Sequence, residues 1–298
     1  MEKVLSDKKM IALFVLPAFI VFISIFLIPV IISFALSLTN WNGVGMPEFI
    51  GIKNYKYIFQ NDDTFWIAMK NTFFFLVASL ISQMSLGFVM AVFLTSGVKF
   101  SNGFKNIYYF PAILSGTAVG FIWRFVFNTR IGLINGALTQ LGLGEYASAW
   151  LGGTEGFIPS GMWCIAFVAM WQFMGTMMVL YIAAINGIPT QTFEAAYLDG
   201  ASKMQTVKYV TIPLLRPMFK TTIILSCVGS LKFFDLVYTM TGGGPGHLTE
   251  VLATHIYTRA FTMWQYGYGN ALSVLLVILC VIVSMFVNKV FVFENYEM

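Results

Sequence analysis

The sequence has 298 residues, of which 58% are hydrophobic and 10% are charged, and its mean hydropathy is +0.79. Soluble domains carry about 25% charged residues, so this composition excludes an ordinary soluble domain and indicates a membrane protein. The formal net charge of +4 is small and dispersed along the chain, so nucleic acid is not an expected partner.

Long apolar runs predict an all-α membrane protein with six membrane-spanning helices in a single domain, 1–298, with no linker between domains. The first run follows a basic N-terminus. It is longer than the about 7–15 residues of a secretory apolar core, and no A-x-A-like cleavage site follows it, so we expect an uncleaved span. Each run is near or above the roughly 20 residues that cross a bilayer. The expected spans cover about residues 10–38, 71–96, 107–128, 161–187, 218–240 and 269–293.

The residue patterns of common catalytic and nucleotide sites are missing from the sequence. It has no G-x-x-x-x-G-K-[ST], no H-E-x-x-H and no G-x-S-x-G. Cys164, Cys227 and Cys280 fall in apolar spans and are interpreted as small buried side chains. His247 and His255 are interpreted as solvated residues of the last loop. We therefore expect no enzyme activity, cofactor or metal site in this chain, and a partner would have to supply ATP hydrolysis for uphill transport.

The segment 188–217 is the polar connection with the most organised sequence. Pro189 suits the start of a helix, and Gly200 can take the positive φ that ends one. A second short helix is expected from about Lys203 to Val210, ending at Pro213. The sequence therefore predicts a helix, a glycine turn and a helix on a membrane surface. On composition alone, an amphipathic connector lying on lipid headgroups is an equally good interpretation.

The placement of Lys and Arg predicts the orientation of the chain, because basic residues concentrate in cytoplasmic loops. One set of segments carries Lys3, Lys8, Lys9, Lys99, Lys105, Lys203, Lys208, Arg216, Lys220 and Lys289. The opposite set carries Lys53, Lys56, Lys70, Arg124, Arg130 and Arg259, spread over longer loops. Both termini and the segment 188–217 are therefore expected to be cytoplasmic.

Polar side chains inside two spans are candidates for a transport pathway, because such groups are costly in lipid. Lys232 and Asp235 are three residues apart in the fifth span, so we expect them to share a helix face. They either contact a substrate or form an ion pair that fixes a helix interface. Aromatic rings beside small polar groups suit sugars, although ordinary helix packing explains the same residues. The candidates are Trp171, Gln172, Phe173 and Thr176 in the fourth span, and Ser226, Gly229, Ser230 and Phe233 on one face of the fifth.

Three separated elements in one frame resemble the EAA loop of permease subunits in binding-protein-dependent ABC importers. These are Glu194-Ala195-Ala196, Asp199-Gly200-Ala201 and Ile212-Pro213-Leu214-Leu215-x-Pro217. Met204, Val207 and Ile212 depart from the usual residues but remain apolar. The resemblance implies a type I ABC importer permease fold in which this loop is a cytoplasmic coupling helix that docks into an ATPase. The residues it assigns to coupling are Glu194, Ala195, Ala196, Asp199, Gly200 and Ala201.

Other stretches extend the resemblance over nearly the whole chain. They are FIGIKNYKYIFQ at 49–60, Phe110-Pro111 and the Thr241-Gly242-Gly243-Gly244-Pro245 turn. The resemblance is to the first permease of maltose-type carbohydrate importers. It implies that Trp171, Ser226, Gly229, Ser230 and Phe233 fall on cavity positions, of which Trp171 and Ser226 keep the residue chemistry. It implies a second homologous permease, two ATPase subunits that bind ATP and Mg²⁺, an extracytoplasmic sugar-binding protein and a carbohydrate substrate. The location implied is the cytoplasmic membrane of a prokaryote, in contact with lipid.

Other functions remain open at this point. A secondary transporter driven by an ion gradient would need titratable groups near the middle of the membrane, and Lys232 with Asp235 is the available pair. An ABC permease for glycerol phosphate or another polyol derivative is a second alternative. A membrane-embedded scaffold or assembly factor, which would show no solute flux, is the third.

Overall fold

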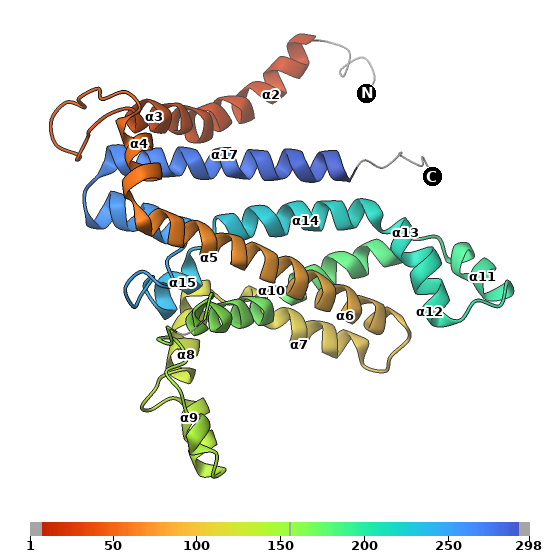
Figure 1. Ribbon diagram of the computed structural model, residues 1–298. Helices are drawn as coiled ribbons and strands as arrows, with labels where there is room; N and C mark the ends of the chain where they lie inside the picture. The colour runs from red at the N-terminus through yellow and green to blue at the C-terminus, as the bar shows by residue number, and fades with distance from the viewer. Residues whose placement is uncertain (1–7, 155, 292–298) are drawn as a thin grey trace. The chain divides into compact units, whose positions relative to one another are not determined.

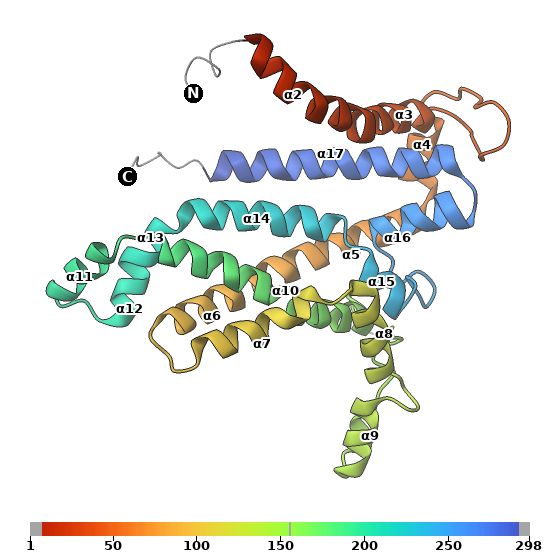
Figure 2. The same cartoon turned by 180° about the vertical axis from the view of Figure 1, so that it is seen from behind.

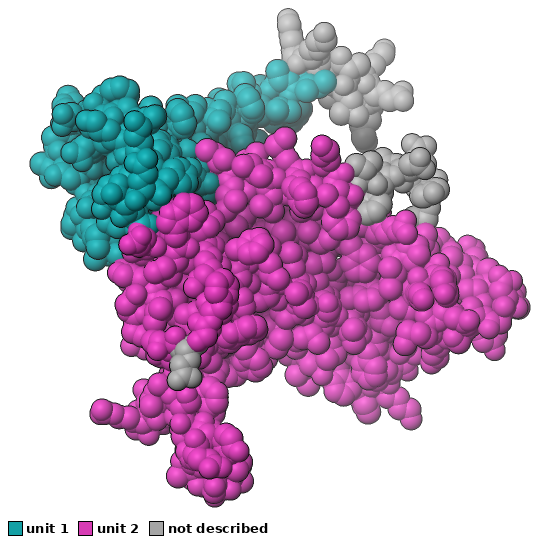
Figure 3. Space-filling view, viewed as in Figure 1, with its two compact units in different colours: residues 1–62, 256–277 teal, residues 63–255, 278–298 magenta. Residues whose placement is uncertain are grey.

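The computed structural model describes residues 8–154 and 156–291, and the regular structure within them is helical apart from one isolated β-bridge between Thr39 and Phe49 (Figure 1). The chain forms two compact units, coloured separately in Figure 3: residues 1–62 with 256–277, and residues 63–255 with 278–298. The expected all-α class is confirmed. The two units are described in turn.

Unit 1 begins with a long apolar helix that contains one π-helical turn. It is built from α2 (Lys8–Phe22), η1 (Ile23–Leu27) and α3 (Ile28–Ser37). Pro17 lies inside α2, and Pro29 lies in the first turn of α3, directly after the π-helical turn. The segment Met10–Ser37 is long and apolar enough to span a membrane. This agrees with the first expected span, 10–38.

The rest of unit 1 joins the segment after α3 to the start of the last long helix. It contains α4 (Lys53–Asn61), the end of α16 (Leu252–Tyr257), η5 (Thr258–Thr262) and the beginning of α17 (Tyr266–Val290). The carboxylate of Asp62, only 4% exposed, accepts hydrogen bonds from Arg259 and from the Tyr268 hydroxyl, with 3.2 Å to the Arg259 guanidinium. A buried ion pair therefore connects segments that are far apart in the sequence.

Unit 2 contains a continuous 33-residue helix, Asp63–Thr95, built from α5 (Asp63–Ser79), η2 (Leu80–Met84) and α6 (Ser85–Thr95). The expected second span began at residue 71, because the charged residues Asp63 and Lys70 interrupt the apolar pattern. The helix nevertheless starts earlier, and Phe65 and Ala68 are buried there. Packing of this first part against the protein explains the difference.

Helix α10 (Ser160–Asn186) forms the centre of unit 2 (Figure 2). It packs on α6 and on α7 (Ser101–Ile113), and the Tyr181 hydroxyl lies 2.9 Å from that of Thr222 on α14 (Arg216–Leu231). A side chain at Gly175 would overlap the backbone carbonyl of Tyr108, so glycine permits the close approach of α7. Two buried apolar clusters lie along α10.

Two expected spans are broken in the structure. The third, 107–128, consists of α7 and α8 (Gly116–Val126), which meet at an angle of 94°. The fifth, 218–240, consists of α14 and α15 (Asp235–Met240), separated at residues 232–234. The prediction that Lys232 and Asp235 share a helix face is therefore wrong. The prediction that Phe233 lies on the same helix face as Ser226 is also wrong. The local helix ends before these residues are reached.

By length and composition, five helices in the described part of the chain suit a membrane span, and the bent pair α7–α8 makes a sixth if it counts as one. Besides those given above, they are Ser160–Asn186, Arg216–Met240 and Tyr266–Val290. The last two residues of the expected sixth span, 292 and 293, lie outside the described residues. The remaining helices are α9 (Leu133–Gln140), η3 (Gly144–Tyr146), α11 (Thr190–Leu198), α12 (Lys203–Thr206), η4 (Val207–Thr211) and α13 (Ile212–Leu214).

Candidate functional site

The segment between α10 and α14 has the expected helix, glycine turn and helix. Pro189 caps the start of α11, and Gly200 follows its end with φ of 75°. The Ser202 side chain accepts from the Gln205 N–H while the Gln205 side chain accepts from the Ser202 N–H, which is a capping box. The helical path continues through η4 and α13 to Leu214, beyond the expected end, because Pro213 sits in the first turn of α13.

Helix α11 buries none of its residues. Glu194, Ala195, Asp199 and Gly200 are exposed, and Ala196 and Ala201 are half-buried. The large apolar side chains of this segment are also exposed, with Tyr197 79%, Leu198 85% and Met204 76% accessible. We call Glu194, Tyr197, Leu198 and Met204 the coupling surface. The six residues predicted for coupling thus lie on or beside a surface that is available to a partner.

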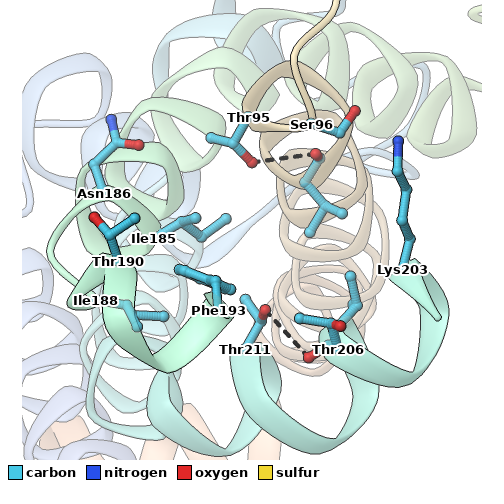
Figure 4. A pocket seen from close by; sticks show the side chains of 12 residues that line it. Thr95, Ser96, Ile185, Asn186, Ile188, Thr190, Phe193, Lys203, Thr206 and Thr211 are labelled. Carbon is cyan, nitrogen blue, oxygen red and sulfur yellow. Dashed lines mark hydrogen bonds between the residues drawn. The ribbon is translucent and has the colours of Figure 1, made fainter. Parts of the chain in front are cut away.

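A pocket of 540 Å³ lies between the segment 188–217, which we call the coupling segment, and the C-terminal ends of α6 and α10 (Figure 4). We call it the α6–α12 pocket. Its apolar lining residues are Val92, Ile185, Ile188, Phe193 and Val207, and its polar ones are Thr95, Ser96, Asn186, Thr190, Lys203, Thr206 and Thr211. Sequence patterns did not single it out, because its residues come from three separate parts of the chain.

A second, smaller pocket of 160 Å³ lies where α14 breaks. It is lined by Gln172, Phe173, Gly229 and Phe233, four of the eight residues predicted to contact a substrate. We call it the pathway pocket. The remaining lining residues are Gly116, Lys232, Phe234, Asp235 and Leu236. The structure therefore brings half of the predicted set together, at the point where two broken helices meet α10.

The other predicted substrate residues lie elsewhere. Trp171 packs edge-on against Trp123, with ring centroids 5.6 Å apart, and Thr176 is half-buried on α10. Ser226 and Ser230 are buried on α14, with 5% and 6% exposed. They do not line the pathway pocket.

Two of the residues predicted to contact a substrate hold buried polar atoms without a hydrogen-bond partner among the described residues. Gln172 is 2% exposed and donates through Nε2 to the Leu114 carbonyl at 3.2 Å, but its Oε1 has no partner among the described residues. The Ser226 hydroxyl is buried in the same unpartnered state. Buried polar atoms are normally hydrogen-bonded, so each unmatched one calls for an explanation.

Lys232 and Asp235 are both exposed and line the pathway pocket from either side of the break. Within the described part of the chain, neither belongs to an ion pair. The interpretation in which these two residues form an ion pair at a helix interface is therefore wrong. Two opposite charges are instead presented to the same small cavity.

The turn after α15 is held by a residue that sequence patterns missed. The Thr249 hydroxyl lies within hydrogen-bond distance of the Thr241 hydroxyl and of the Gly244 carbonyl, at 2.7 and 2.8 Å. Glu250, 2% exposed, lies 3.0 Å from His247 Nδ1 and close against Gly243. His247 is exposed as expected, but His255 is 2% exposed, so its interpretation as a solvated residue is wrong. Among residues 8–154 and 156–291, no three His, Cys, Asp or Glu side chains gather to hold a metal.

Comparison with known proteins gives matches over almost the whole chain. The family model described as "Binding-protein-dependent transport system inner membrane component" matches residues 83–293. The probable ABC transporter permease protein YurN of Bacillus subtilis is 34% identical, over 94% of each chain. The probable starch degradation products transport system permease protein AmyD of Thermoanaerobacterium thermosulfurigenes is also 34% identical, over 91% of this chain and 90% of that protein.

The fold has a solved counterpart as well. A bacterial ABC transporter involved in the import of the acidic polysaccharide alginate has a chain that superposes with a TM-score of 0.81, at 20% identity and over 94% of each chain. At this identity the likeness shows the fold. The family match over residues 83–293 and the 34% identical relatives establish that the chain belongs to the binding-protein-dependent transport system inner membrane components, the membrane-embedded permeases of ABC transporters.

Proposed function

We propose that the chain is the permease subunit of an ATP-driven importer and forms half of the translocation pathway for a sugar or oligosaccharide. An extracytoplasmic binding protein would deliver the substrate, a second homologous permease would form the other half, and two ATPase subunits would bind ATP and Mg²⁺. The chain itself would catalyse no reaction. It would lie in the cytoplasmic membrane of a prokaryote, with both termini and the coupling surface in the cytoplasm.

The observation that carries this proposal is the coupling surface. The first helix of this helix-turn-helix buries none of its residues. Exposure of the apolar side chains of Tyr197, Leu198 and Met204 to water costs free energy, so this surface favours a partner. In the family that the chain belongs to, the corresponding loop docks into the ATPase. Movement of the ATPase would be transmitted along α10 and α14, which flank the segment and are joined by the Tyr181–Thr222 hydrogen bond.

The names of relatives support a carbohydrate as the substrate. AmyD is named for starch degradation products, and a 34% identical relative from Streptococcus mutans is named the multiple sugar-binding transport system permease protein MsmF. A second solved structure related in fold contains an alginate pentasaccharide-bound periplasmic protein. The pathway pocket would contact part of such a ligand, because the side chains of Phe173, Phe233 and Gln172 line it.

The decisive experiment is to purify the chain with the subunits that co-purify from its host and to reconstitute the complex in nanodiscs. ATP hydrolysis is then measured with the binding protein and a panel of neutral and acidic glycans, with glycerol 3-phosphate as a non-glycan comparison. We expect one glycan class to raise hydrolysis several-fold in the presence of the binding protein. A complex that contains no ATPase, or that responds to glycerol 3-phosphate and to no glycan, would overturn the proposal.

A further inference from the structure

The α6–α12 pocket is separate from the pathway pocket and has a different chemical character. At 540 Å³ it falls within the roughly 300–1,000 Å³ of small-molecule sites. The bundle supplies one side through α6 and α10, and the coupling segment supplies the other through α11, α12 and η4 (Figure 4). A molecule in this pocket would therefore touch both the spanning helices and the part of the chain that meets the ATPase.

The charge of the pocket is positive. Among the described residues that line it, Lys203 is the one cation, and no carboxylate is present. Lys203 is exposed, and no acidic group of the described chain lies within ion-pair distance of it. An exposed, unpaired ammonium group facing a cavity without acids favours an anionic ligand, and a phosphate is a common partner of such a point charge.

The neutral polar groups add a second requirement. Thr95 and Thr206 donate their hydroxyl hydrogens to carbonyls of their own helices, at 2.8 and 3.1 Å, so they have lone pairs left to accept a hydrogen bond. Asn186 and Thr190 make no side-chain hydrogen bond within the described residues and can donate as well as accept. Acceptors around a cavity match a ligand with several hydroxyl groups. The apolar side chains of Ile185 and Phe193 match a carbon skeleton.

We propose that the α6–α12 pocket binds a phosphorylated polyol, with its phosphate against Lys203 and its hydroxyls toward Thr95, Asn186 and Thr190. Two sources carry this chemistry: a soluble sugar phosphate, or the glycerophosphate headgroup of an anionic phospholipid. Either ligand holds α12 against the ends of α6 and α10. A bound ligand therefore restrains the coupling segment. The effect of this restraint on transport rests on the proposed function, but binding of the ligand does not depend on it.

The binding test uses the purified full-length chain, without partners or transport. In the first arm, glucose 6-phosphate, glucose and inorganic phosphate are titrated calorimetrically into the chain in neutral detergent. In the second, native mass spectrometry measures phosphatidylglycerol retained by the chain extracted from mixed phosphatidylglycerol and phosphatidylcholine nanodiscs. We expect binding in one arm, with glucose at least tenfold weaker than its phosphate or phosphatidylcholine at least tenfold less retained.

Two variants make the test specific to the site. Lys203→Gln removes the charge from an exposed position and is expected to weaken binding at least tenfold in the arm that shows it. Lys208→Gln removes a neighbouring charge that rests on the Tyr209 ring and does not line the pocket, so its binding should equal that of the wild type. Amide exchange of residues 203–211 should slow when the ligand is bound.

The proposal is overturned if neither probe binds, or if Lys203→Gln binds as tightly as the wild type. Thr95→Val keeps the shape of a lining side chain and removes its hydroxyl. An unchanged affinity of this variant for glucose 6-phosphate and for phosphatidylglycerol would contradict the proposal that the ligand is a polyol. A complex that imports sugar normally while the chain binds neither probe would contradict this inference and leave the proposed function standing.

Discussion

Gln172 lines the pathway pocket and has one side-chain atom without a hydrogen-bond partner among the described residues. Its Nε2 donates to the Leu114 carbonyl at the bend between α7 and α8, while its Oε1 is buried without a partner among the described residues. A buried amide that is half satisfied costs free energy unless something else pairs with it. A substrate hydroxyl reaching this oxygen would supply that pairing during transport.

We therefore predict that Gln172→Leu raises the substrate concentration needed for half-maximal uptake about tenfold, the equivalent of roughly 1.4 kcal/mol. Leu has a similar volume, so thermal unfolding and the amount of inserted protein should change little. Gln83→Leu is the matched control, because Gln83 is also buried, at 6% exposed, and does not line the pathway pocket. Equal uptake kinetics for wild type and Gln172→Leu would assign Gln172 to packing alone.

Asp62 is a residue whose importance only the structure reveals. In the sequence it is one of two adjacent acids in a polar stretch, whereas in unit 1 its side chain is 2% exposed and pairs with Arg259 and Tyr268. Removing one partner of a buried pair leaves the other charge uncompensated, which typically costs about 3–5 kcal/mol. The pairing partners are too distant in sequence for any local pattern to show.

Asp62→Ala is accordingly predicted to lower the thermal unfolding midpoint of the purified chain strongly. Asp63→Ala, at the exposed neighbouring acid, should have a small effect. In a double-mutant cycle with Arg259→Met, the two losses should be far from additive, since both variants break the same pair. Additive losses in the cycle would show that the ion pair contributes little.

At the scale of the elements, the apolar runs predicted where helices occur better than where they end. The span 10–37 and the long α10 follow from the length of their apolar runs. Pro17 and a π-helical turn lie in the first of these runs without ending the helix. The break at 232–234 has no such signal: Lys-Phe-Phe contains neither Gly nor Pro. Contacts from α8 explain it better, as Gly116 lies directly against the Asp235 side chain.

The candidate site was also predictable where local sequence signals determine the structure, and not where tertiary contacts do. The coupling segment was predictable because Pro189 and Gly200 are local signals. Of the eight residues predicted to contact a substrate, four line the pathway pocket, whereas Trp171 lies against Trp123 and both Ser226 and Ser230 are buried on α14. Side-chain directions at a helix break depend on tertiary contacts, which periodicity does not contain.

The coupling surface leads to a prediction at this scale. Glu194 is exposed, so Glu194→Lys should leave the chain folded and inserted while reducing the ATPase that co-purifies with it about tenfold. Gly200→Asp should do the same by a different route, because its φ of 75° costs a residue with a side chain roughly 1–2 kcal/mol and would redirect α12.

Glu145→Lys provides the control for charge reversal, since Glu145 is exposed in η3, away from the coupling segment. Pull-down of the ATPase from membranes, normalised to inserted permease, gives the measurement. Normal recovery of the ATPase with both coupling variants, together with normal uptake, would contradict a docking role for this surface.

At the scale of the whole molecule, both the family and the fold indicate a transporter. The energy source that drives transport can be measured on the assembled complex. An ion-driven mechanism would need a titratable pair in the spans, and the structure places Lys232 and Asp235 together at the pathway pocket without pairing them. The same two charges fit a role in selecting substrate polarity, which requires no change in their protonation.

We predict that proteoliposomes containing the assembled complex take up substrate only when ATP is present on the side of the coupling surface. Collapse of ion gradients by ionophores should leave the rate unchanged, because in the proposed mechanism the ATPase drives transport mechanically through α10 and α14. The double variant Lys232→Gln, Asp235→Asn should keep this dependence on ATP while shifting the preference between neutral and acidic glycans, since it removes both charges from the pocket lining. Uptake that follows an imposed ion gradient without ATP, and that this variant abolishes, would instead establish the ion-driven mechanism.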